Sequence, residues 1–267
     1  MKQAQPEEYK IYAIKYAHHN RRSSANFIGG DIHDTEMPLD YFVWAVVGQS
    51  RTFLVDTGFD APMGEKRGRS ITRPIQEGLG AIGIDPDAIE DIILTHMHFD
   101  HAGNRTLFPR ARYHVQEREM SYCTGRCMCH GALNHPYEPD DVTELVRKVY
   151  QGRVCFHDGT AELTPGLSLH LVGGHTNGLQ IVRVHTARGW VVLASDASHL
   201  YANMEQGRPF PAVYNIGDML DGYARAYQLA DSPLHVIPGH DPEVLRRFPA
   251  HRKETEGWIV RLDGQPR

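Results

Sequence analysis

The chain has 267 residues, of which 41% are hydrophobic and 23% charged, so it is long enough to bury a sizeable core without disulfide or metal staples. Its 28 Lys and Arg stand against 33 Asp and Glu, a formal net charge of −5, which provides no positive field for a polyanion. No apolar run approaches the ~20 residues that a membrane span needs. We therefore expect neither nucleic acid nor a membrane as partner.

The N-terminus and the cysteines indicate the compartment. Residues 1–8 are polar and acidic and lack the apolar core of a signal peptide, so we expect a cytoplasmic protein. Cys123, Cys127 and Cys129 lie close together, but their spacing lacks the Cys-x2-Cys pair of common zinc modules. We expect reduced thiols. The abnormal feature is 17 histidines, because imidazole is the commonest protein ligand for metals.

The first half of the chain begins with 40 residues that we interpret as polar and irregular. Two β-rich runs, 41–47 and 52–55, then flank a Gly-containing turn and predict a hairpin. After a Gly- and charge-rich loop, the pattern indicates a helix from Pro74, a short helix capped by Asp85, a buried strand over 91–94, a small helix ending at Leu107 and a strand over 111–115.

The second half begins with a long insertion, residues 117–139, which we place near the active site. An amphipathic helix follows, with apolar residues at 142, 145, 146 and 149. The remaining pattern predicts strands over 167–172, 179–185, 190–194, 234–237 and 258–260, and a helix over 217–229. Because short turns join several strands, we expect an α/β (α+β) fold of mixed sheets between helices. No linker or repeat interrupts residues 1–267, which predicts a single domain.

One motif carries the chemistry. His96, His98, Asp100 and His101 follow the buried strand in the spacing His-x-His-x-Asp-His. Four donors in so short a loop cannot all surround one ion, but they can present two groups to each of two neighbouring metals. Other strand ends supply further donors beside glycines that let the backbone bend, namely His175, Asp196 and His240. The sequence therefore predicts a dinuclear metal site.

These segments together resemble the metallo-β-lactamase superfamily. The resemblance rests on Thr95–His101, Gly174-His175, Ser195-Asp196 and Pro238–His240, with Leu54–Gly58 upstream. It implies an αββα sandwich with both metals at one edge of the two sheets. It also implies that His96, His98 and His175 hold one metal, that Asp100, His101 and His240 hold the other, that Asp196 bridges them, and that Asp56 orients a ligand histidine.

Differences from other members of the superfamily at two positions narrow the choice of reaction. The best-known β-lactamases place Cys where this chain has Asp196, and diiron oxygen-reducing relatives place Glu where it keeps His98. Hydrolysis with zinc is therefore expected. The arrangement most resembles the N-acyl homoserine lactone lactonase family, through Ser195–Tyr201 and Gly173–Gly178. That family carries Tyr three residues after the bridging Asp, a position that is His199 in this chain.

The resulting hypothesis is a hydrolase with two Zn²⁺ ions that opens an N-acyl homoserine lactone or a similar small lactone. Two zinc ions about 3.5–4 Å apart would supply a bridging hydroxide as the nucleophile. Asp100 would shuttle the proton, and His199 or Tyr201 would contact the carbonyl oxygen. We expect the substrate to be lined by Tyr122, Met128, Tyr137 and Tyr214.

Other functions use the same pattern. A glyoxalase II-type thioesterase, or another small-ester hydrolase of this fold, would need the same ligands. A nuclease is disfavoured by the acidic composition. A noncatalytic sensor that binds a ligand at its metal site is disfavoured by the full ligand set. A homodimer is possible.

Overall fold

The computed structural model describes residues 6–104 and 106–267 and contains two β-sheets packed face to face. The first sheet is built from β1 (Lys10–His19), β2 (Leu39–Val47), β3 (Thr52–Val55), β4 (Ser70–Ile71), β5 (Asp91–Ile93), β6 (Arg112–Gln116), β7 (Val154–His157) and β13 (Ile259–Arg261). The second comprises β8 (Thr160–Thr164), β9 (Leu167–Leu171), β10 (Gln180–Thr186), β11 (Gly189–Ser195) and β12 (Val236–Pro238). The helices are α1 (Ala61–Arg67), α2 (Ile75–Ala81), α3 (Phe99–Ala102), α4 (Glu117–Cys123), α5 (Gly131–Asn134), α6 (Pro139–Tyr150), α7 (Tyr201–Glu205), α8 (Ile216–Leu229) and α9 (Glu243–Arg247).

Both sheets are mixed, as the short connections predicted. The first has the order β13-β1-β2-β3-β5-β6-β7, with β4 paired to β1, and the second has the order β12-β11-β10-β9-β8. The predicted hairpin is present as the antiparallel pair β2–β3, in which Trp44 faces Val55. Strands β3, β5, β6 and β7 then run parallel. Their carboxyl ends therefore meet at one edge of the sheet.

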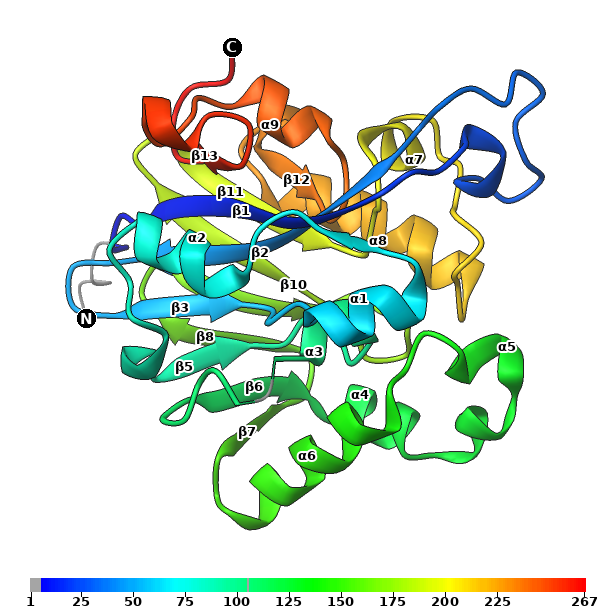
Figure 1. Ribbon diagram of the computed structural model, residues 1–267, viewed down its shortest axis with the longest axis horizontal. Coiled ribbons are helices and arrows are strands. Elements are labelled where there is room, and N and C mark those ends of the chain that lie inside the picture. The colour runs from blue at the N-terminus through cyan, green and yellow to red at the C-terminus, as the bar shows by residue number, and fades with distance from the viewer. Residues whose placement is uncertain (1–5, 105) are drawn as a thin grey trace.

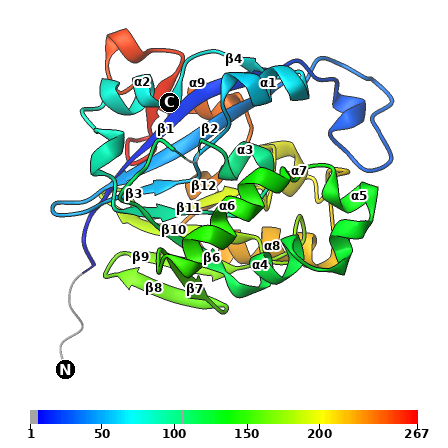
Figure 2. The same cartoon turned by 60° about the horizontal axis from the view of Figure 1, so that its bottom comes forward.

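Side-chain alternation divides the core into two layers. In β1, Ile11 and Ala13 belong to the core between the sheets, whereas Tyr12 and Ile14 belong to the core on the outer face of the first sheet. This is the period of two expected for a strand covered on both faces. Helices α2 and α6 cover that outer face, and α8 packs on the second sheet (Figures 1 and 2). The architecture is the expected αββα sandwich.

The expectation that residues 1–40 are irregular is wrong for residues 10–19. Residues 1–5 lie outside the described part of the chain, but Lys10–His19 form β1, which pairs with β2 on one side and β13 on the other. Both neighbours are distant in sequence, so the pairing leaves no local signal. Residues 20–38 then form a loop that docks beside α7, where Ile28 N donates to the Pro209 carbonyl at 2.8 Å.

Several boundaries also differ from prediction. The loop after β3 contains α1, whose first turn is capped by the Asp60 carboxylate accepting from Met63 N at 2.9 Å. The small helix α3 ends at Ala102 and not at Leu107. The predicted strand over 234–237 begins only at Val236. The insertion over 117–139 is not a plain loop, since it contains α4 and α5.

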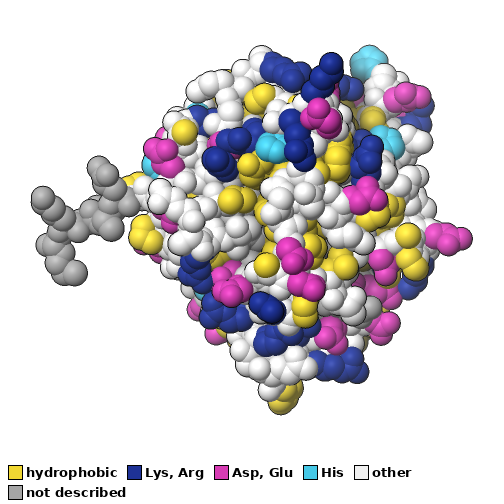
Figure 3. Space-filling model, turned by 60° about the vertical axis from the view of Figure 1, so that its left-hand side comes forward, with side chains coloured by type: hydrophobic (Ala, Val, Ile, Leu, Met, Phe, Trp, Pro, Cys, Tyr) yellow, Lys and Arg dark blue, Asp and Glu magenta, His cyan; other side chains and the backbone are white. Residues whose placement is uncertain are grey.

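The surface agrees with the balanced composition. On the face shown in Figure 3, basic and acidic side chains are interspersed, an arrangement without the one-sign field that draws in a polyanion. Within residues 6–104 and 106–267, no helix is both long and apolar enough to cross a membrane.

Candidate metal centre

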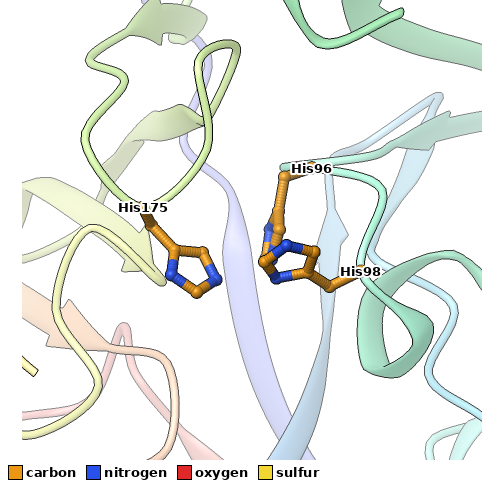
Figure 4. A group of neighbouring side chains, drawn as sticks. All are labelled: His96, His98 and His175. Atoms are coloured by element: carbon orange, nitrogen blue, oxygen red, sulfur yellow. The ribbon is translucent and has the colours of Figure 1, made fainter. Parts of the chain in front are cut away.

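Loops at the ends of strands from both sheets bring the seven predicted donors together. The loop after β5 supplies His96 and His98 and leads into α3, whose first turn carries Asp100 and His101. The second sheet supplies the other three from the loops after β9, β11 and β12, namely His175, Asp196 and His240. All seven are buried. His96 and His98, from the first sheet, and His175, from the second, point toward one another in Figure 4.

The donors form two groups that share one carboxylate. In one group, His96, His98 and His175 place their ligand atoms within 4.8 Å of one another. In the other, Asp100, His101, Asp196 and His240 do the same. The two oxygens of Asp196 face different groups. Its Oδ2 lies 3.3 Å from His175 Nε2, and its Oδ1 lies 3.0 Å from His240 Nε2.

Unpaired buried nitrogens indicate what these groups are built to bind. The Nε2 atoms of His96, His101 and His175 are buried and have no hydrogen-bond partner in the described structure. Leaving a buried polar atom unpaired costs about 1–3 kcal/mol. Burial, followed by the charges of neighbouring histidines, holds the pKa of His96 well below its usual value. Imidazole nitrogens and carboxylate oxygens are the donor set that zinc prefers, so these residues fit metal binding.

Hydrogen bonds on the far side of three rings fix which nitrogen faces the centre. His175 Nδ1 lies 2.6 Å from the Ala212 carbonyl, and His240 Nδ1 lies 3.0 Å from the Asp40 carbonyl. A carbonyl only accepts, so each Nδ1 carries the proton and each Nε2 presents its lone pair. His101 Nδ1 is likewise 2.7 Å from Asp56 Oδ2.

Asp56 occupies the position expected of an orienting carboxylate. Besides His101, it accepts hydrogen bonds from Thr95 N at 2.7 Å and Thr95 Oγ1 at 2.8 Å. Thr95 Oγ1 in turn lies 2.9 Å from Ser195 Oγ, next to Asp196. Asp56 and Ser195 have φ angles of +61° and +45°, a region that is strained for non-glycine residues and is enriched at functional sites. This network joins the metal-binding loops of the two sheets.

The carboxylates and histidines of the second group shift one another's pKa values. Although burial opposes it, the carboxylates of Asp196, Asp100 and Asp56 raise the pKa of His101. Burial also opposes ionisation of Asp100, yet His101 and His240 hold the pKa of Asp100 below its usual value. The group therefore keeps its carboxylates ionised, as metal ligands must be.

His199 lies beside the centre. Its Nε2 is 2.9 Å from Asp196 Oδ2, and its ring stacks on Phe210 with centroids 3.5 Å apart. Burial lowers the pKa of His199 to about 3, so the ring is neutral and Nε2 donates to the carboxylate. Its Nδ1 is buried and has no partner among the described residues.

The structure brings only some of the predicted substrate residues to the centre. Tyr122 lines a pocket of about 280 Å³ whose wall includes His98 and His175. Tyr137 packs edge-on against His98, with ring centroids 4.5 Å apart. Tyr214 packs against Tyr122 at 4.8 Å between ring centroids.

The other two predicted residues lie in different pockets. Met128 lines a neighbouring pocket on the α6 side, together with Val142. Tyr201 lines a pocket beside α9 and stacks under the Arg247 guanidinium, which lies 3.7 Å from its ring centroid. Because that pocket contains none of the seven donors, the geometry does not support contact between Tyr201 and a substrate carbonyl.

Glu119 is the residue that sequence reasoning missed. It is fully buried in α4 and accepts hydrogen bonds from Met97 N, Tyr137 Oη and Thr176 Oγ1 at 2.9, 3.0 and 2.6 Å. Met97 lies between His96 and His98, and Thr176 follows His175, so one carboxylate holds both loops of the first group. No local signal identifies it, because an acid at the start of a helix is ordinarily a solvated, favourable charge.

Comparisons with known proteins agree with this geometry. The family model described as "Metallo-beta-lactamase superfamily" matches residues 37–246. The chain therefore belongs to the metallo-β-lactamase superfamily, and with this site it is a metal-dependent hydrolase.

Individual relatives narrow the comparison. The chain is 31% identical over 193 residues to N-acyl homoserine lactonase AiiB from Agrobacterium fabrum (strain C58 / ATCC 33970), covering 69% of this chain and 67% of that protein. It is 32% identical over 171 residues to an N-acyl homoserine lactonase from Bacillus sp, covering 63% and 62%.

Solved structures share the fold. A quorum-quenching N-acyl homoserine lactone lactonase superimposes with a TM-score of 0.72 at 24% identity, covering 90% of this chain and 94% of that one. AidC, a dizinc quorum-quenching lactonase, superimposes with a TM-score of 0.68 at 18% identity, covering 90% of each chain.

Proposed function

We propose that this protein is a dizinc hydrolase that opens the ring of a small lactone, with N-acyl homoserine lactones as the first class to test. One observation carries the proposal. Seven buried donors form two groups that share Asp196, and a pocket of about 280 Å³ opens onto two of them. Lactonase relatives about 30% identical in sequence support the choice of substrate.

In this proposal His96, His98 and His175 would hold one zinc, Asp100, His101 and His240 would hold the other, and Asp196 would serve both groups. When bound, two such ions lower the pKa of a water and polarise an ester carbonyl. Asp56 and the carbonyls of Asp40 and Ala212 keep three of the imidazoles in the correct tautomer. To act as the nucleophile, the attacking water has to lose one proton.

The proton that the water loses needs an acceptor, and the ring oxygen that leaves needs a proton. Hydroxide adds to the carbonyl carbon, the ring C–O bond breaks, and the ring oxygen leaves with the electron pair and takes up a proton. We assign that proton transfer to Asp100, whose Oδ2 lies 3.4 Å from His101 Nε2 and 3.6 Å from His240 Nε2. His199 donates to Asp196, so we assign it to holding that carboxylate beside the reacting carbonyl.

The test combines metal content with turnover. Protein purified without chelator should contain two zinc ions per chain by elemental analysis. It should open a panel of short- and long-chain acyl homoserine lactones, lose that activity on chelation and regain it with zinc. Cytoplasmic location and homodimer formation stay predictions.

Each other result has a definite meaning. Two metals with turnover of S-acyl glutathione but not of lactones would replace the proposed substrate with a thioester. Two metals with ligand binding and no turnover of either would favour a sensor. Less than one metal per chain, not restored by zinc, would contradict the ligand assignment.

A further inference from the structure

Two arginines near the metal centre have no ionic partner among the residues that the structure describes. Arg21 lines the same pocket as His98 and His175. Its side chain donates to the Ala25 carbonyl, and no described carboxylate lies within ion-pair distance of it. Arg69, which also has no carboxylate partner among residues 6–104 and 106–267, donates to Tyr41 Oη at 2.8 Å.

Tyr41 connects Arg69 to the metal centre. Its ring packs edge-on against His240, with centroids 4.9 Å apart. Tyr41 is buried, and its hydroxyl is the acceptor for Arg69. The guanidinium of Arg69 is therefore one side chain away from the second group of donors, while Arg21 lines the same pocket as His98 and His175 of the first group.

The pKa values of nearby groups reflect the positive charge of these two arginines. The pKa of His19 falls to about 4 because of burial, followed by the charges of Arg69 and Arg21. Burial lowers the pKa of Arg21 itself, and the charge of Arg69 adds to that effect. Two partly buried like charges without a counterion are costly. Two other arginines of the same region do have a counterion. Arg67 pairs with Glu138 at 3.3 Å, and Arg22 pairs with Asp34 at 2.6 Å.

We propose that Arg21, in the added positive field of Arg69, binds an anionic group, a carboxylate or a phosphate, carried by the substrate at a distance from the scissile ester. The inference rests on the proposed lactone hydrolysis and narrows it to substrates with a negative charge on the side chain. Tyr122 and Leu133 contribute apolar wall to the same pocket. Arginine is suited to this task because its planar fork matches both anions.

The experiment uses two lactones that differ only at the end of the side chain, one neutral methyl and one carboxylate, with the zinc-loaded protein. We expect kcat/KM to be at least tenfold higher for the carboxylate, and the preference to shrink with added salt. Arg21→Ala should reduce the ratio of the two kcat/KM values at least tenfold, and Arg21→Lys should retain part of it. The matched control is Arg110→Ala, an exposed arginine outside this pocket, which should keep the wild-type ratio.

A second readout separates this inference from the proposed reaction. Inorganic phosphate binding, measured by calorimetry with wild type and Arg21→Ala in the same zinc-loaded state, requires no turnover. We expect weaker binding to the variant. Equal affinities, or equal kcat/KM for the two lactones in wild type, would overturn the anion site and leave lactone hydrolysis intact. Turnover of neither lactone together with weaker phosphate binding by Arg21→Ala would keep the anion site and reject the lactone.

Discussion

At the scale of single residues, the centre depends on histidines whose tautomer is fixed by a hydrogen bond. Nδ1 of His175 and of His240 is hydrogen-bonded to a backbone carbonyl, so neither ring can turn away without losing that hydrogen bond. Such a ring meets a metal without reorganisation. Asp100 differs from these residues because we assign it a second role, in proton transfer.

Replacing Asp100 with Asn tests that assignment. The amide has nearly the same shape but cannot accept the proton or supply a negative ligand, so we expect kcat/KM to fall by about 100-fold or more. The fold should persist, because Asn has nearly the same size as Asp and the backbone carbonyl at this position still accepts from Tyr16 Oη. The measurements are turnover, zinc content and thermal unfolding. Near-normal turnover would reject both the ligand and the proton-transfer role.

At the scale of elements, α4 and the loop over 173–178 touch at their backbones. A Cβ at Gly178 would lie 2.0 Å from Glu119 N and 2.3 Å from Glu119 Cα. Gly178 N also donates to Glu119 Oε2 at 3.2 Å. The loop that carries His175 is therefore seated directly on α4, and its position depends on the absence of a side chain at Gly178.

Gly178→Ala should push the loop away from α4. We expect a loss of about 1–3 kcal/mol in the free energy of unfolding, as for other overpacked sites, and weaker zinc binding because His175 moves. Denaturant unfolding and zinc titration measure the two effects. The matched control is Gly131→Ala, since a Cβ there meets nothing within 4 Å. Equal effects of both substitutions would contradict this account.

A second element-scale contact joins β5 to its neighbours away from the metals. Buried Asp91, in β5, accepts from Arg51 at 2.7 Å, Arg112 at 3.0 Å and His114 at 3.1 Å. Although burial opposes it, the hydrogen bond from His114 and the charge of Arg51 hold the pKa of Asp91 below its usual value. The contact joins β5 to β6 and to the turn before β3.

That lowered pKa predicts a pH dependence. An acid with a lower pKa in the folded state stabilises the fold above its unfolded pKa, and the stabilisation is lost as the pH falls through the folded value. The free energy of unfolding should therefore drop below about pH 4. Asp91→Asn should remove this part of the drop. Since metal release also destabilises at low pH, the informative quantity is the difference between wild type and variant, which should shrink as the pH falls.

At the scale of the whole molecule, the centre ties together the ends of two sheets. His96 and Asp100 come from the first sheet, and His175 and Asp196 from the second. Bound ions would cross-link the sheets, since ligands that bind only the folded state stabilise it. The hydrophobic layer between the sheets would remain without them.

Chelation should therefore lower Tm without unfolding the protein at room temperature. Zinc at about 1,000 times its Kd contributes about 4 kcal/mol, which for a chain of this size is a shift in Tm on the order of 10 °C. Calorimetry with and without chelator measures it. Asp196→Asn, which weakens both groups at once, should show a much smaller chelator effect. A Tm that is indifferent to chelator in wild type would contradict a shared metal centre.

The sequence by itself determined the class of the protein, a metal-dependent hydrolase, and most of the elements. The donors between His96 and His101 lie within six residues, so their function is visible locally, and the β2–β3 hairpin has a short turn that encodes its pairing. The resemblance built on such motifs correctly implied the sandwich. In contrast, β1 was missed because its partners lie at β2 and β13.

Only the tertiary structure decided which distant side chains share a site. Glu119 becomes a clamp because folding buries it against loops 22 and 57 residues away, and Arg21 faces the centre because a loop from β1 reaches the pocket. Tyr201 turns toward Arg247 instead. Local patterns report residue type and periodicity, whereas burial and the direction of a side chain follow from long-range packing, which no short segment contains.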